Sequence, residues 1–249
     1  MRLAAQVHGE AGDRPTLLVA HGLFGSARNW GAIARRLSAD RRVVAVDMRN
    51  HGTSPWAETH DYEAMAEDLA SVIDGRWDVL GHSMGGKAAM VLALRDPAKV
   101  NRLVVADIAP VSYGHSQAHL VDAMERLDLS QIASRSDADR ALAATVDDAG
   151  VRAFLLQSLD VRERVWRLNL PVLAREMSKI LSFPDTGGSF EGPALFLTGA
   201  ASDYVRAEHH DRIRKLFPNA RFAAIQGAGH WVHAEKPREF EGAVAGFLD

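Results

Sequence analysis

The chain has 249 residues, which suits one α/β domain with a modest insertion better than two independent domains. Its 29 basic and 32 acidic residues nearly balance, so the protein has no strong positive field to attract nucleic acid. Cysteine is absent, which excludes disulfide bonds, a thiolate nucleophile and cysteine-ligated metal centres. Nucleophilic chemistry must therefore use oxygen or nitrogen.

The N-terminal segment, residues 1–9, lacks the apolar stretch of a secretory signal peptide. No part of the chain approaches the roughly 18 uninterrupted apolar residues that a membrane-spanning helix needs. We therefore expect a cytoplasmic protein without a membrane span. The sequence predicts no particular oligomeric state.

Short apolar runs, each followed by loop residues, predict buried parallel strands along the chain. Segments with apolar residues at helical spacing lie between them, which is the alternation of a mostly parallel, doubly wound α/β sheet. The expected strands lie at 16–22, 43–46, 79–80, 103–106, 194–198 and 221–225. The expected helices lie at 30–37, 62–73, 84–95, 207–217 and 237–247.

The alternation stops between about residues 112 and 185. This stretch shows helical patterns at 117–127 and 137–146 but no convincing strand. A structureless loop of that length is rare in a compact domain, so we expect a helical cap inserted over the sheet. The expected division is a core at 1–111 and 190–249, a cap or lid at 112–189, and a return hinge at 184–192.

The segment at 81–85 reads Gly-His-Ser-Met-Gly and fits the G-x-S-x-G pattern between a predicted strand and a predicted helix. So sharp a turn forces the central serine into a strained backbone conformation, and small neighbours leave room for it. Gly81 and Gly85 provide this room, so Ser83 is the candidate nucleophile. The helix that starts at Met84 adds amides and a dipole that favour developing negative charge.

A second loop, His-Gly-Leu-Phe-Gly at 21–25, follows the first predicted strand. The loop at this position commonly builds the other half of an oxyanion hole beside such a serine. We assign the two oxyanion donors to the backbone amides of Leu23 and Met84, with Phe24 as an alternative to Leu23. His21 is expected to brace the loop rather than to transfer protons.

His230 ends the sequence Gly-Ala-Gly-His, after the last predicted strand and before a helix led by Pro237. In the chain order nucleophile, acid, histidine, this position belongs to the general base. His233 offers a metal pair with His230, but no carboxylate motif accompanies the two histidines. We therefore expect no metal.

The acid of the site has two candidates. In most relatives of this fold the strand predicted at 194–198 ends in Gly-x-x-Asp, whereas here Ser202 takes that position and Asp203 follows it. Asp107 directly follows an earlier strand, at the carboxyl edge of the sheet where catalytic groups gather. We assign the acid to Asp107, which would fix the tautomer of His230, and expect the Ser202 hydroxyl to support it. Asp203 remains the alternative.

Four longer motifs make the chain similar to a known family. On them the chain resembles the YbfF-type esterases, small bacterial α/β-hydrolases akin to the mitochondrial abhydrolase domain-containing protein 11. The likeness spans nearly the whole chain outside the cap. The motifs are D-M-R-N-H-G at 47–52, G-H-S-M-G-G-K-A-A-M at 81–90, D-I-A-P-V at 107–111 and G-A-G-H-W-V-H-A-E-K-P at 227–237.

This resemblance implies the α/β-hydrolase fold with an inserted cap, and hydrolysis of carboxylic esters or thioesters without a cofactor. It also implies that the acid after the sixth strand of the fold, here Asp107, belongs to the catalytic set. Acyl preference resides in the cap, where the resemblance is weakest.

Other residues near these motifs have structural interpretations. Lys87, one turn into the helix after the candidate nucleophile, is expected in an ion pair or in helix packing rather than as a catalytic amine. Arg49, Asn50 and His51 are expected to brace a loop at the same edge of the sheet. Trp231 is expected to pack beside His230.

Together these residues predict a serine hydrolase that cleaves esters or acyl thioesters with short to medium acyl chains. Ser83 would form an acyl intermediate, and His230 would take the serine proton and later activate water. Haloalkane and epoxide chemistry on this fold uses an aspartate nucleophile, which a serine contradicts. Carbon–carbon hydrolase, aminopeptidase, perhydrolase and lyase activities remain alternatives, as does a non-catalytic receptor.

Overall fold

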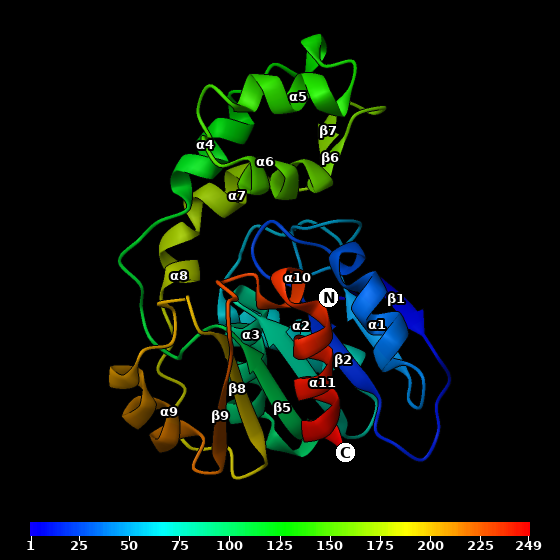
Figure 1. Cartoon of the computed structure of the whole chain (residues 1–249), viewed down its shortest axis with the longest axis vertical. Helices are drawn as coiled ribbons and strands as arrows, with labels where there is room; N and C mark the ends of the chain where they lie inside the picture. Colours follow the sequence, from blue (N-terminus) through cyan, green and yellow to red (C-terminus); the bar gives the residue numbers. More distant parts are fainter.

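The computed structural model describes all residues, 1–249, and is built around a seven-stranded sheet (Figure 1). The strand order is β1-β3-β2-β4-β5-β8-β9; β1 pairs antiparallel with β3, and all the other neighbouring strands are parallel. This confirms the mostly parallel α/β sheet. The strands are β1 (Ala5–His8), β2 (Leu17–Ala20), β3 (Val43–Val46), β4 (Trp77–His82), β5 (Val100–Ala106), β8 (Ala194–Gly199) and β9 (Ala220–Ile225).

All six predicted strands are present, and β1 is the strand that the sequence pattern missed. β1 reads Ala-Gln-Val-His and pairs antiparallel with β3 at the edge of the sheet. Its first three side chains are exposed, so it lacks the apolar run that marks a buried strand. The central strands β2 and β3 are buried at every position, which is why their sequences are continuously apolar.

Helices cover both faces of the sheet, as the alternating pattern predicts. On one face, α1 (Gly31–Leu37) and α11 (Pro237–Leu248) pack on side chains such as Val19 and Leu197. On the other face, α2 (Tyr62–Val72), α3 (Met84–Arg95) and α9 (His210–Leu216) pack on the alternate side chains of the same strands. Because the side chains of a strand alternate between its faces, one buried strand serves both clusters.

Residues 112–189 contain five helices, and these helices lie at one end of the core (Figure 1). We call this segment the cap. No strand was expected here, but the cap also contains a short antiparallel pair, β6 (Leu159–Asp160) and β7 (Val165–Trp166). Strands of two residues are too short to produce an alternating pattern. The helices are α4 (Ala118–Glu125), α5 (Arg135–Leu142), α6 (Ala149–Leu155), α7 (Leu170–Arg175) and α8 (Met177–Leu181).

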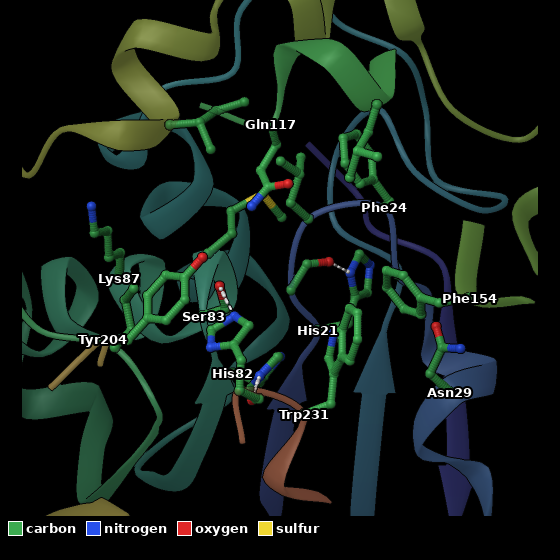
Figure 2. Close-up of a pocket in the computed structure, with 18 of the residues that line it drawn as sticks. His21, Phe24, Asn29, His82, Ser83, Lys87, Gln117, Phe154, Tyr204 and Trp231 are labelled. Atoms are coloured by element: carbon green, nitrogen blue, oxygen red, sulfur yellow. Dashed lines mark hydrogen bonds between the residues drawn. The ribbon is translucent and has the colours of Figure 1, made fainter. Parts of the chain in front are cut away.

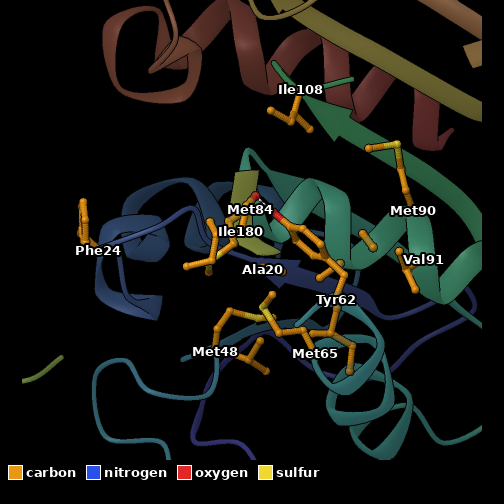
Figure 3. Packing of buried hydrophobic residues seen from close by; sticks show 14 of the residues in the cluster. Ala20, Phe24, Met48, Tyr62, Met65, Met84, Met90, Val91, Ile108 and Ile180 are labelled. Atoms are coloured by element: carbon orange, nitrogen blue, oxygen red, sulfur yellow. Dashed lines mark hydrogen bonds between the residues drawn. The ribbon is translucent and has the colours of Figure 1, made fainter. Parts of the chain in front are cut away.

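The cap and the core share one hydrophobic cluster of 50 buried residues. Figure 3 shows Ile180 of α8 beside Tyr62 and Met84 of the core. The Tyr62 hydroxyl also donates a hydrogen bond to the Ile180 carbonyl, at 2.5 Å. The cap is therefore packed directly onto the core by shared apolar burial. None of the helices has the length and apolar character needed to cross a bilayer.

Candidate active site

Ser83 lies in a sharp turn between β4 and α3, with φ 51° and ψ −117°. A Cβ atom on Gly81 would lie 2.2 Å from the Gly85 carbonyl oxygen, and one on Gly85 would lie 2.4 Å from the Ala20 carbonyl oxygen. Only glycine fits at these two positions. The Ser83 amide donates to the carbonyl of Ala106 on β5 at 3.0 Å, which fixes the strained turn to the sheet.

One imidazole joins the serine to a carboxylate. His230 Nε2 lies 3.1 Å from Ser83 Oγ, and His230 Nδ1 lies 2.8 Å from Asp107 Oδ2. The Asp107 side chain is fully buried, whereas 23% of the His230 side chain is exposed. Because Nδ1 faces a carboxylate it carries the proton, and Nε2 is left with a lone pair toward the serine hydroxyl.

The structure brings Asp107, and not Asp203, to this imidazole. Asp107 has φ 52°, and its Oδ1 accepts the Gly199 amide at 3.0 Å. Its Oδ2 accepts the hydroxyl of Ser202 as well as His230 Nδ1. Asp203 is exposed and makes no hydrogen bond with His230. Ser202, which stands where most relatives of this fold have an aspartate, thus donates a hydrogen bond to the Asp107 carboxylate at the end of β5.

Two further side chains hold His230, and the sequence patterns did not single them out. The Tyr204 ring stacks on the imidazole with centroids 3.9 Å apart. His82 Nε2 donates to the backbone carbonyl of His230 at 2.9 Å. Burial lowers the pKa of His82 well below its usual range, so it stays neutral beside the base. The only signal for them in the sequence is that His82 directly precedes Ser83 and that Tyr204 comes two residues after Ser202.

The loop after β2 lines the cavity above Ser83 and contains the Leu23 amide, which is unpaired. The Leu23 amide donates to no group of the chain, whereas the Phe24 amide donates to His51 Nε2 at 3.2 Å. Met84 opens α3, so its amide lies in the first turn, where a helix provides no carbonyl partner. Of the two candidates in the loop, Leu23 therefore has the available N–H.

His21 braces this loop, as predicted. Its Nδ1 donates to the Gly22 carbonyl at 2.8 Å, and its Nε2 accepts the Met48 amide at 2.9 Å. Burial lowers the pKa of His21, which keeps the imidazole neutral and able to make both bonds. Asn50 also braces its loop, since its carboxamide oxygen accepts the Ala57 amide at 2.7 Å.

Lys87 was expected either in an ion pair or in helix packing. It forms no ion pair, and its buried side chain packs between α3 and the cap. Its side chain is 1% exposed, and Nζ donates to the carbonyls of Leu181 and Ser182 at 2.9 and 2.6 Å. Nζ also lies 4.8 Å from the centre of the Tyr113 ring. Burial lowers the pKa of Lys87 to about 7. Lys87 thus links α3 to the end of α8 in the cap.

A cavity of about 270 Å³ lies between Ser83 and the cap. Figure 2 shows Tyr204 and Lys87 on one side of Ser83, and Asn29 and Phe154 on the other. Trp231 lines this second side, where it packs against Phe154 with centroids 5.6 Å apart. The cap contributes more apolar than polar side chains to the walls: Tyr113, His115, Gln117, Leu120, Val151, Phe154, Ile180 and Leu181.

No group of three or more histidine or carboxylate side chains gathers in the geometry of a metal site. His233 stacks on Trp30 with centroids 4.4 Å apart, and burial lowers its pKa to about 3. We therefore assign no residue to metal binding, and the chain's own oxygen and nitrogen atoms carry the chemistry considered below.

The candidate nucleophile, base and acid, with the two candidate oxyanion donors, all lie near the carboxyl ends of parallel strands, under a helical cap. This is the arrangement of the serine hydrolases built on an α/β sheet. The chain belongs to the alpha/beta hydrolase family, whose model matches residues 17–243.

Several relatives are similar over nearly the whole chain. Esterase YbfF of Escherichia coli is 37% identical over 255 residues, which cover 100% of this chain and 99% of that protein. The sn-1-specific diacylglycerol lipase ABHD11 of Mus musculus is 43% identical over 248 residues, covering 94% of this chain and 81% of that protein. A solved marine microorganism esterase superposes with a TM-score of 0.94 at 35% identity, covering 99% of both chains. The resemblance noted from the motifs is thereby confirmed.

Proposed function

We propose that the protein is a serine hydrolase that cleaves carboxylic esters or acyl thioesters through an acyl-serine intermediate. The observation that carries the proposal is the continuous hydrogen-bonded chain from Ser83 through His230 to Asp107. The names of the similar proteins, which include esterases and a lipase, support the same class of reaction.

In the first half of the reaction, Ser83 Oγ attacks the substrate carbonyl while His230 Nε2 takes the serine proton. Asp107 stabilises the imidazolium that forms. The amides of Leu23 and Met84 donate to the oxyanion of the tetrahedral intermediate. His230 then gives its proton to the leaving alcohol or thiol, and the acyl group stays on Ser83.

In the second half, water replaces the leaving group. His230 Nε2 takes a proton from the water as its oxygen attacks the acyl-serine carbonyl. The same two amides hold the second oxyanion. Its collapse releases the carboxylic acid and returns the proton to Ser83 Oγ, so that the enzyme is regenerated without any cofactor.

The size and lining of the cavity support short to medium acyl chains. A volume of about 270 Å³ lies at the small end of ligand pockets, and the cap side chains that close it are mostly apolar. A small-molecule ester or thioester is thus the proposed substrate. A cytoplasmic location remains a prediction, which cell fractionation would test.

A series of p-nitrophenyl esters and acyl-CoA thioesters of increasing chain length tests this function. We expect the wild type to hydrolyse the shorter members and Ser83→Ala to lose activity on all of them. Hydrolysis that survives Ser83→Ala, or a wild type that cleaves neither class, would overturn the proposal.

A further inference from the structure

Phe24 adopts a backbone conformation that is unfavourable for a bulky residue, directly after the free amide of Leu23. Its φ is 64°, in the left-handed region, and its side chain is buried. Such a conformation persists only where its surroundings hold it. Phe24 directly follows Leu23 in the chain. A change in the backbone conformation of Phe24 would therefore turn the peptide group that follows the proposed oxyanion donor.

Both polar groups of the Phe24 backbone are held by side chains. The amide donates to His51 Nε2 at 3.2 Å, and the carbonyl accepts the hydroxyl of Ser158 at 2.8 Å. Ser158 belongs to the cap, at the end of a short 3-10 helix, and it is buried. The cap therefore touches the loop of the proposed oxyanion hole directly.

His51 is suited to accept rather than donate at this position. Its Nδ1 lies 2.9 Å from the Arg49 carbonyl, so Nδ1 carries the ring proton and Nε2 has the lone pair. The ring is fully buried, and burial followed by the neighbouring His21 lowers the pKa of His51 well below its usual range. The bond to Phe24 is therefore kept across the whole neutral pH range.

The cap also holds the loop that carries His51. The Gly52 amide donates to the Arg167 carbonyl at 2.8 Å, and the Asn169 amide donates to the Asn50 carbonyl at 3.0 Å. These two bonds lie on either side of His51. A strand-like stretch of the cap thus pairs with the loop on both sides of this histidine.

The two routes meet within the cap. The Arg167 amide donates to the Ser158 carbonyl at 2.8 Å, so the residue that holds Phe24 directly is bonded to the stretch that holds it through His51. One part of the cap therefore reaches both polar groups of a single strained residue in the core.

We infer that Ser158 and His51 are positioning residues, which hold Phe24 so that the Leu23 amide points at the oxyanion, and that docking of the cap thereby completes the oxyanion hole. This inference rests on the proposed function. Ser158 acts on the reaction through the loop and does not touch the substrate. Its loss should therefore weaken stabilisation of the transition state and leave acyl binding largely unchanged.

The test compares Ser158→Ala with Ser158→Thr, which keeps a hydroxyl, and with Ser130→Ala as a matched control. Ser130 is an exposed cap serine whose hydroxyl bonds only its neighbours Asp128 and Gln131. We expect Ser158→Ala to lower kcat roughly 10- to 100-fold, since a misplaced catalytic group costs up to about 100-fold. KM should stay within about twofold, Ser158→Thr should recover most of kcat, and Ser130→Ala should equal the wild type.

A transition-state analogue separates positioning from general damage to the fold. The affinity for a trifluoromethyl ketone, which forms an oxyanion on the serine, should fall by the same factor as kcat/KM in Ser158→Ala. The affinity for the alcohol product, which has no carbonyl or carboxylate oxygen to place in the oxyanion hole, should not change. The loss of kcat should also be the same for short and long acyl chains.

An unchanged kcat in Ser158→Ala, or a change confined to KM, would overturn the inference. The proposed function would still stand if the wild type is active and Ser83→Ala is inactive. An inactive wild type would overturn both. If thermal melting shows that Ser158→Ala is unfolded, His51→Leu replaces it, with His51→Gln as the variant that keeps an acceptor. His51→Leu with wild-type kcat would then refute the inference.

Discussion

Ser83 and Asp107 meet the same imidazole because each lies in a left-handed backbone conformation at the end of its strand. Their φ angles are 51° and 52°, where a residue with a Cβ atom is rare. Each turn is fixed by a bond from its own amide to a neighbouring strand, Ser83 to Ala106 and Asp107 to Leu197. The sheet thus holds the strain at the residues that we propose to react.

Replacing the acid by its amide distinguishes the two aspartates. We expect Asp107→Asn to lower kcat roughly 10,000-fold, because an amide leaves the wrong tautomer of His230 facing the serine. Asp203→Asn should change kcat less than about twofold, since Asp203 is exposed and away from His230. Steady-state kinetics on one p-nitrophenyl ester measures both. If Asp203→Asn were the impaired variant, the acid assignment would be wrong.

At this scale the sequence indicated the reacting residues but not those that hold them. Ser83 and His230 stand in patterns that leave few alternatives. Tyr204 and the bond from Phe24 to His51 could not be predicted, since they join segments far apart in the chain without a local pattern. Asp107 was distinguished from Asp203 because Ser202 breaks the usual spacing, because Asp107 directly follows a strand, and because the family resemblance implies it.

Among the elements, the turn from β4 into α3 leaves no room for a side chain at Gly81 or Gly85. A methyl group on Gly85 would collide with the Ala20 carbonyl on β2. We therefore expect Gly85→Ala to lower the free energy of unfolding by about 1–3 kcal/mol or more, as overpacking does. Gly242→Ala is the matched control, because Gly242 lies in α11 with open space around it.

The control should instead stabilise the protein by about 0.5–1 kcal/mol, since alanine favours a helix over glycine. Urea denaturation followed by circular dichroism gives both values. Equal effects from the two substitutions would contradict the close approach of α3 to β2.

The link between α3 and α8 should depend on pH through Lys87. Its folded pKa of about 7 lies below the ordinary value of 10.5, so between these values the unfolded chain binds more protons than the folded one. Stability should therefore rise with pH across this window. In the folded protein the facing tyrosines, Tyr62 and Tyr113, have raised pKa values and do not titrate in this window, and a measurement that stops at pH 9.5 stays below the ordinary tyrosine pKa of 10.0.

Subtracting Lys87→Met from the wild type isolates this effect. The difference in melting temperature between the two proteins should shift in favour of the wild type from pH 7 to pH 9.5. A difference that stays constant over this range would show that Lys87 is not held away from water in the folded state.

Elements were predicted where burial on one or two faces leaves a pattern. β2 and β3 are apolar throughout because both of their faces are covered. β1 escaped detection because its side chains are exposed at the edge, and β6 and β7 because they are two residues long. The cap helices were expected in kind, but nothing in their spacing fixes how they sit on the core.

In the whole molecule, cap and core share one hydrophobic cluster, so we expect them to unfold as one cooperative unit. Val121 and Met124 of α4 are as buried as Val91 of α3. We expect amide hydrogen exchange in α4 and α3 to report the same free energy of opening. Exchange through a much lower opening energy in α4 would instead describe a lid that detaches while the core stays folded.

The most direct test of the account is the mass of the protein trapped during turnover of a slowly hydrolysed p-nitrophenyl ester. Acyl transfer to Ser83 predicts one added acyl group on the tryptic peptide that contains Ser83, and a burst of p-nitrophenol equal to the enzyme concentration. Asp107→Asn should form the adduct far more slowly, and Ser83→Ala should form none. An unmodified wild type that still turns over, or an acyl group that persists in Ser83→Ala, would contradict the central claim.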